Sequence, residues 1–128
     1  MANSITTLAS DLEISFDHGC RFRAVDCIRG NFDTLASDLT IFTPASGFIW
    51  ALVGVLYSKA AAHQIIFTSG STQLVSLDIS SNGLAKGVGS GDGVLLTGLA
   101  AGDALKVQFT TAFASQVLFY VAQYKPLG

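Results

Sequence analysis

The amino-acid sequence predicts an all-β fold, either an antiparallel β-sandwich or a jelly roll. Short runs in which apolar and polar residues alternate recur along the chain, and this period of two is typical of half-buried strands. Glycine, proline and asparagine separate the runs at intervals of about 8–12 residues, as turns do in antiparallel folds. The apolar runs are rich in β-branched and aromatic residues, which favour strands over helices.

The chain is expected to form a single domain with two unequal parts. Residues 1–47 predict an N-terminal arm and short strands, and residues 48–128 predict the main strands of the sandwich. The loop at Thr43–Gly47, which contains proline and glycine, separates them. Met1–Ser10 has no clear periodicity, so it is interpreted either as a flexible arm or as a strand added to a neighbouring molecule.

Before the final segment, each alternating or apolar run predicts a strand. They are Leu12–Phe16, Cys20–Ile28, Phe48–Ser58, His63–Thr68, Leu74–Ser80 and Val94–Thr97. Ser69–Ser71 predicts a tight hairpin turn between two of these strands. Asn82-Gly83 follows the next strand, and Asn-Gly is the strongest short-range signal for a hairpin. Gly87–Gly93 is expected to form a flexible loop.

The final segment, Ala104–Tyr124, predicts the two strands around which the rest of the chain packs. Leu105–Phe109 alternates, Thr110–Ser115 is expected to form a short bend, and Val117–Tyr124 is apolar on both faces. A strand that is apolar on both faces is covered on both. We therefore expect one face to meet the core and the other to meet a second sheet or a neighbouring subunit.

Composition limits the classes of function. Charged residues make up 12% of the chain and apolar residues 50%, and the charged share is about half the usual one. So little charge predicts an obligate oligomer that buries apolar strand faces between subunits. The net charge of −2 without a basic run argues against nucleic-acid binding. The longest uncharged apolar run, Phe48–Tyr57, is about half of what a membrane-spanning helix needs, and the N-terminus has no signal-peptide pattern.

No motif in the sequence predicts a catalytic residue, a cofactor or a metal ion. The glycines of Gly87–Gly93 lack both the dinucleotide spacing and a Lys-Ser/Thr pair for phosphate. His18, Cys20 and Cys27 are chemically suited to zinc but lack paired ligand spacing, so buried, reduced thiols are expected. A Ser-His-Asp site is assembled in space and could use only His18 or His63 as its base, and the sequence has no Gly-x-Ser-x-Gly elbow to point to one. The chain is therefore predicted not to be an enzyme.

Two stretches resemble a known family. One is Ile65–Leu74, with its Ser-Gly-Ser turn, followed by Asn82-Gly83. The other is Gly93–Gly98, followed by Ala101–Val107 and the terminal strand. Together they resemble small β-sandwich virion proteins of tailed bacteriophages, and the second turn is also similar to one in tumour-necrosis-factor-like jelly rolls. The resemblance covers roughly residues 48–124 and carries over no catalytic residue. It implies a structural protein of the head surface or tail, often trimeric.

The expected function is therefore that of a structural virion protein that decorates or cements the phage head. Its expected partners are further copies of itself, as a homotrimer, and the major capsid protein or other virion proteins, with no nucleic acid and no membrane. It would be made in the host cytoplasm and be located in the virion. The interface candidates are the N-terminal arm together with Phe109, Phe113, Phe119, Tyr120 and Tyr124, although these aromatic residues are equally typical of a monomer core. The alternatives are a tail or fibre module that binds a host-surface ligand, and a small hydrolase.

Overall fold

The computed structural model describes residues 4–15, 21–32, 36–57, 63–79, 83–86, 95–109 and 115–125. This part of the chain is all strand, turn and loop, in agreement with the predicted fold class. The strands are β1 (Ser4–Ser15), β2 (Arg21–Phe32), β3 (Ala36–Phe42), β4 (Ile49–Tyr57), β5 (His63–Ser69), β6 (Thr72–Ile79), β7 (Gly83–Lys86), β8 (Leu96–Thr97), β9 (Leu105–Phe109) and β10 (Ser115–Tyr124).

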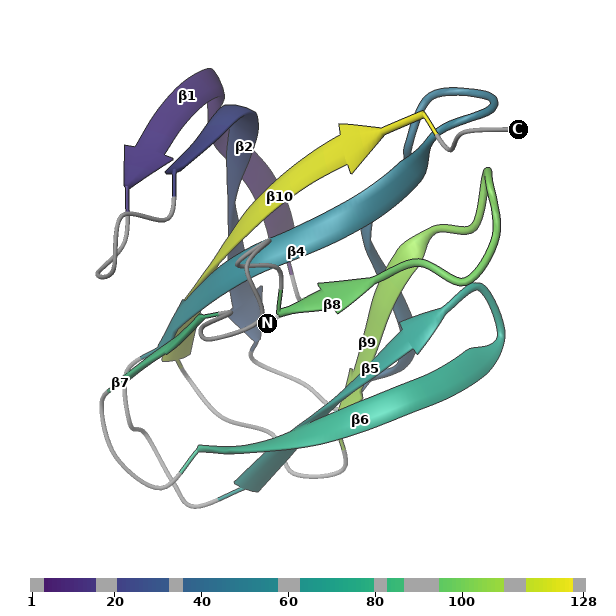
Figure 1. Ribbon diagram of the computed structural model, residues 1–128. Helices are drawn as coiled ribbons and strands as arrows, with labels where there is room; N and C mark the ends of the chain where they lie inside the picture. Colours follow the sequence, from purple (N-terminus) through teal and green to yellow (C-terminus); the bar gives the residue numbers. More distant parts are fainter. Residues whose placement is uncertain are drawn as a thin grey trace.

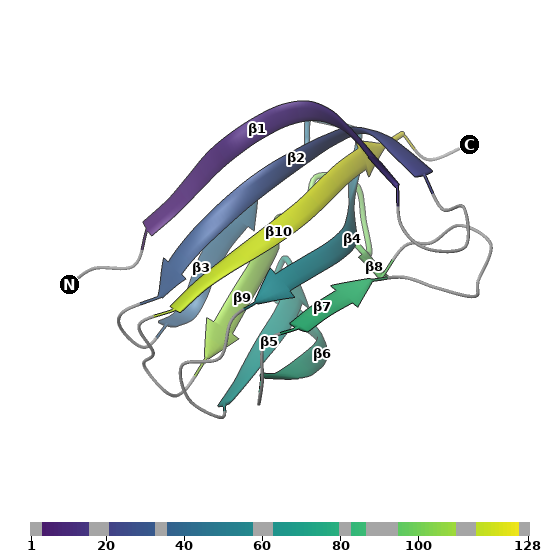
Figure 2. The ribbon, with the colours of Figure 1, turned by 90° about the vertical axis from the view of Figure 1, so that its left-hand side faces the viewer.

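The strands form two antiparallel sheets that pack face to face as a sandwich (Figure 1). The six-stranded sheet has the order β1-β2-β10-β4-β7, and β8 also pairs with β4. The four-stranded sheet has the order β3-β9-β5-β6. Figure 2 shows the curved six-stranded sheet in front of β3, β9 and β5. Each sheet therefore contains strands from residues 1–47 and strands from residues 48–128.

The core lies between the sheets and is centred on β10. Val117, Phe119 and Val121 are almost fully buried on its inner face. The ring of Phe119 meets the ring of Phe67, on β5, edge to face at a centroid distance of 6.2 Å. Each such side chain contributes about 1.5–3 kcal/mol through burial. The prediction that one face of this strand meets the core is confirmed, and Trp50, at 0% exposure, belongs to the same core.

The last two strands belong to different sheets. β9 pairs with β3 and β5, whereas β10 pairs with β2 and β4. The final segment is therefore not a hairpin, and its two strands face each other across the core. Of the predicted bend at Thr110–Ser115, residues 110–114 lie outside the described residues.

One of the two predicted hairpins is correct. Ser69 pairs with Thr72, and Gly70 between them has a φ of +59°, so β5 and β6 form the hairpin that Ser69–Ser71 predicted. The Asn82-Gly83 hairpin is wrong, because β7 leaves β6 and pairs with β4 in the opposite sheet. The segment between the two strands, residues 80–82, lies outside the described residues. The predicted loop at Gly87–Gly93 lies outside the described residues.

The N-terminal stretch corrects another prediction. Residues 4–10 are neither a flexible arm nor a strand given to a neighbour, because they form the first half of β1 and pair with β2 of the same chain. Pairing is regular from Ser4 to Thr7. It is then interrupted by three register shifts before Ile14, and Asp11 has a φ of +57°. Both strands bend strongly (Figure 1), as expected where bulges interrupt a ladder.

Candidate functional site

The two sequence motifs that carried the family resemblance lie next to each other in space. The hydroxyl of Ser69 donates a hydrogen bond to Oδ2 of Asp103 over 3.0 Å. The backbone N–H of Gly70 donates to the carbonyl of Ala104 over 2.9 Å. A Cβ on Gly70 would lie 3.3 Å from the carboxyl of Asp103 and would strain a positive φ. The β5–β6 turn and the loop before β9 are thus joined into one rigid unit.

A second set of contacts joins this unit to the start of β4. The N–H of Gly98 donates to the carbonyl of Trp50 over 3.0 Å, and the N–H of Leu99 donates to Oγ of Ser69 over 2.9 Å. A Cβ on Gly98 would lie only 2.9 Å from Nε1 of Trp50. Nε1 of Trp50 is buried and has no hydrogen-bond partner in the part of the chain that the structure describes. The loop therefore packs directly on the indole, and only glycine leaves room for it.

The loop before β4 is held in the same way. The N–H of Phe48 donates to the carbonyl of Ala45 over 2.9 Å, and the N–H of Gly102 donates to the carbonyl of Phe48 over 3.0 Å. Oε1 of Gln123, near the end of β10, accepts a 2.7 Å hydrogen bond from the N–H of Ala45. Two loops and the end of β10 are thereby fixed relative to one another before any partner binds.

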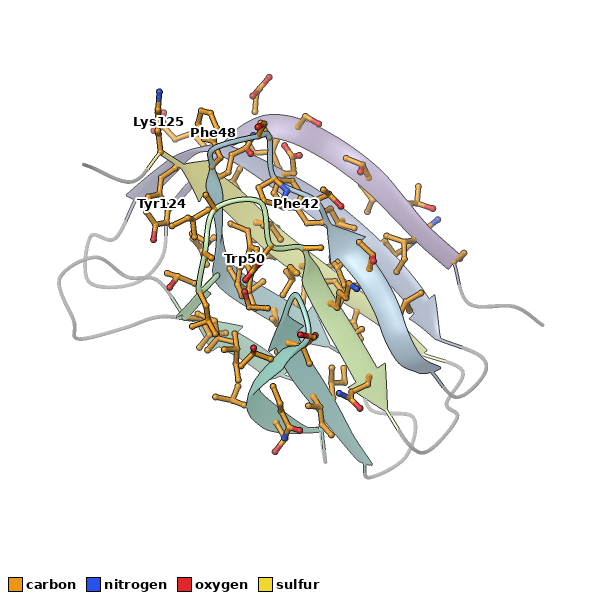
Figure 3. All side chains as sticks on the ribbon, turned by 90° about the vertical axis from the view of Figure 1, so that its right-hand side faces the viewer. Phe42, Phe48, Trp50, Tyr124 and Lys125 are labelled. Carbon is orange, nitrogen blue, oxygen red and sulfur yellow. The ribbon has the colours of Figure 1, made fainter. Side chains whose placement is uncertain are left out.

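The surface that these loops present is apolar and almost uncharged. Leu99 is 58% exposed and Tyr124 is 42% exposed, while Phe48 and Ile49 are half-buried. Figure 3 shows Phe48, Tyr124 and Lys125 at one end of the sandwich, with Trp50 between the sheets. We call this surface the apolar end, and it comprises residues 45–49, 98–102 and 123–125. Lys125 is the single charged side chain within these ranges, and the half-buried carboxyl of Asp103 borders them, where it accepts a hydrogen bond from Ser69.

Among the predicted aromatic interface residues whose side chains the structure describes, Tyr124 alone lies at the apolar end. Phe119 lies in the core, and Tyr120 is half-buried on the outer face of β10 opposite Cys27 of β2. Phe109 ends β9, but its side chain, like the whole of Phe113, lies outside the described residues. The interface role of these five residues stays a prediction. Sequence reasoning missed Leu99 and Phe48, although the uncharged loops that carry them are visible in the sequence.

Cys27 and Tyr120 share a side-chain hydrogen bond on the outer face of the six-stranded sheet. Burial raises the pKa of the Cys27 thiol above its ordinary value, and the bond to Tyr120 offsets part of that rise. The pKa of Tyr120 is also raised, mainly by burial and then by the neighbouring thiol. Both groups are therefore held neutral at neutral pH, which makes Cys27 a poor nucleophile.

The described residues offer no other assembled chemistry. Among them, no group of three or more His, Cys, Asp or Glu side chains is placed to hold a metal ion. His18 and Cys20 fall outside this part of the chain, and so does the side chain of His63. No helix long and apolar enough to cross a membrane occurs in the same residues.

Comparison with protein-family models, with curated proteins and with solved structures found no match for this chain.

Proposed function

We propose that this chain is a structural protein of a tailed-phage particle. It decorates or cements the head, associates with copies of itself as a homotrimer, and contacts the major capsid protein or another virion protein. It is made in the host cytoplasm and resides in the virion. Its action is mechanical, because apolar area buried across subunit boundaries stabilises the shell and repetition over many sites adds avidity.

The observation that carries this proposal is the apolar end. Hydrogen bonds to Trp50, Ser69 and Gln123 hold its loops in place. Little conformational entropy is therefore lost when a partner covers them. A surface with one charged side chain and an exposed Leu99 suits an apolar protein surface better than a charged ligand. The low charge of the whole chain adds support, because it favours burial of surface between subunits.

The test begins with tailed-phage particles from the organism that encodes the chain. Mass spectrometry of purified particles is expected to find this protein in many copies per particle, and light scattering of the free protein is expected to give three times 13.4 kDa. Particles that lack the protein would refute the proposal. A protein present in particles but monomeric in solution would refute the trimer alone.

Docking is tested with two matched variants in a sedimentation assay with heads that lack the protein. Leu99→Glu places a charge on the apolar end and is expected to abolish co-sedimentation. Val75→Glu places the same charge on β6, where Val75 is 43% exposed, and is expected to leave binding unchanged. Equal binding by both variants would show that the apolar end is not part of the interface with the head.

A second candidate function is recognition of a host-surface glycan by a tail or fibre module. The observation in its favour is that Phe48 and Tyr124 lie at the same end as Lys125 (Figure 3), since aromatic rings with a nearby polar group suit a sugar. A glycan array probed with the labelled chain decides between the two. Specific binding that is lost in Tyr124→Ala would favour the module.

A further inference from the structure

The outer face of the six-stranded sheet carries an apolar row that ends in a half-buried arginine. The ladders place Thr6, Arg29, Leu118 and Leu56 side by side, from β1 to β4. Leu56 is 41% exposed, and Leu118 is half-buried. Tyr120, two residues further along β10, shares this face and is also half-buried. We call Arg29, Leu118, Tyr120 and Leu56 the outer patch.

Arg29 is the polar member of the outer patch whose hydrogen bonding is incomplete. Its Nε is buried and has no hydrogen-bond partner among the described residues. A buried donor without an acceptor is unfavourable, and more so when the group is charged. Native proteins leave few such donors unpaired. A partner molecule that brings an acceptor to this guanidinium would therefore gain more than it would at an exposed arginine.

The charges around the outer patch are all positive. β4 and β10 carry no charged residue, and β7 carries only Lys86. The register puts position 86 in line with Gly54 and Tyr120, on the outer face. On β2, Asp26 is in line with Val121, on the core face. Cations therefore occupy both ends of an apolar row, with no acid at the described positions between them, in a chain whose net charge is −2.

We infer that the outer patch binds an acidic segment of another protein, in which two carboxylates flank an apolar side chain. The carboxylates pair with Arg29 and Lys86, and the apolar side chain covers Leu118 and Leu56. β2 and β7 are three strand spacings apart, about 14 Å. Carboxylates four residues apart on an extended segment are separated by about 13 Å. The inference goes beyond the proposed function, because it assigns a second binding surface apart from the apolar end.

Charge complementarity favours this occupant over two others. One strand of duplex DNA carries a charge about every 3.4 Å, so its phosphates would lie over Leu118 and Leu56 without counter-charges. A second copy that presented the same patch would bring cations together, and like charges oppose association. A carboxylate, in contrast, forms strong charge-assisted hydrogen bonds with a guanidinium.

The experiment is an NMR titration of the isotope-labelled full chain with the peptide Ac-Gly-Glu-Thr-Leu-Thr-Glu-Gly-NH2, whose glutamates are four residues apart. Amide shifts are expected in β2, β10 and β4, with a dissociation constant of about 1 mM. Added salt is expected to weaken the binding, because it screens exposed charges. The same peptide with lysine in place of both glutamates is expected not to bind.

Two kinds of variant locate the contact. Arg29→Gln and Lys86→Gln are each expected to raise the dissociation constant about tenfold. Lys125→Gln removes the same charge from an exposed position at the apolar end and is expected to leave it unchanged. Leu56→Glu keeps both cations and is also expected to weaken binding about tenfold. Its matched control is Val75→Glu on exposed β6, which is expected to bind like the wild type.

Four results would each overturn the inference: no amide shifts at about 5 mM peptide, equal binding of the lysine peptide, wild-type affinity in both glutamine variants, or tighter binding of a DNA oligonucleotide than of the peptide. None of them touches the proposed function, which is tested separately with phage heads and with Leu99→Glu at the apolar end.

Discussion

The apolar end and the β1 edge are built in opposite ways. The apolar end is held from several strands at once, through Ser69, Gly98 and Gln123, and it packs on the buried indole of Trp50. β1 is held by one neighbouring strand, and bulges interrupt its ladder. The difference teaches that two ends of one sandwich can be fixed by different means: loops that cross-link several strands at the apolar end, and a single antiparallel ladder at β1.

The strongest test of this difference removes the anchor of the apolar end. Trp50→Ala deletes a fully buried side chain on which Gly98 packs, and it is expected to lower the free energy of unfolding by about 3–5 kcal/mol. Urea unfolding followed by far-UV circular dichroism measures the change. Leu8→Ala on β1, where Leu8 is 48% exposed, is expected to stay within about 0.5 kcal/mol. If both variants lost a comparable free energy of unfolding, the apolar end and β1 would not differ in their contribution to stability.

A gain of one methyl group probes the same contact from the other side. Gly98→Ala places a Cβ 2.9 Å from Nε1 and 3.0 Å from Cδ1 of Trp50, a clash with a rigid buried ring. The expected loss of stability is about 1–3 kcal/mol, measured by urea unfolding. Ala101→Ser in the exposed part of the same loop is the control and is expected to be neutral. A neutral Gly98→Ala would mean that the loop is not packed tightly on the indole.

The hydroxyl of Ser69 is expected to matter to a smaller but still measurable extent. Ser69→Ala removes the acceptor of the Leu99 N–H and the donor to Asp103, at a cost of about 1–2 kcal/mol. Amide hydrogen exchange is the sharper measurement, because the Leu99 amide is expected to exchange faster while amides in β1 stay unchanged. Ser76→Ala, at an exposed position of β6, is expected to alter neither quantity. Unchanged exchange at Leu99 would show that Ser69 does not hold the loop.

Alkaline pH is expected to produce the smallest change in the free energy of unfolding, and this change arises at Cys27 on β2. The pKa of Cys27 is raised in the folded state, so the fold favours the protonated thiol. Its contribution is therefore complete below the ordinary thiol pKa of 9.0 and is lost as the pH rises through the folded-state pKa. Thermal melts across this range are expected to show declining stability, and Cys27→Ala is expected to flatten the decline. A wild-type stability that rises with pH would contradict this cause.

Much of the secondary structure was predictable because strand signals are local. Alternation in Leu105–Phe109 and the apolar run from Phe48 each correspond to a strand, and the Ser-Gly-Ser turn is the hairpin that it predicted. Pairing partners were less predictable. An Asn-Gly signal is local and does not say which strand the next one will pair with, and the structure places β6 and β7 in opposite layers.

The candidate site was less accessible to sequence reasoning than the fold. The aromatic residues of the final strands were interface candidates because of their residue type, yet Phe119 lies in the core. Alternation along a strand shows which residues share a face, but it does not show which face is covered. Leu99 gave no signal of its own. It stands out only because Ser69, 30 positions earlier, accepts its N–H and holds its loop in place.

The sequence by itself determined the fold class, the position of most strands, and the scarcity of charge that points to association, because each depends on residue types and short-range spacing. The tertiary structure alone decided that β9 and β10 lie in opposite sheets and that the two turn motifs meet at one end. It also decided that the N-terminal stretch is an edge strand of its own chain. The physical reason is that pairing and layer assignment depend on contacts between residues far apart in the sequence, and the alternation of side chains along a strand is the same for every partner it might have.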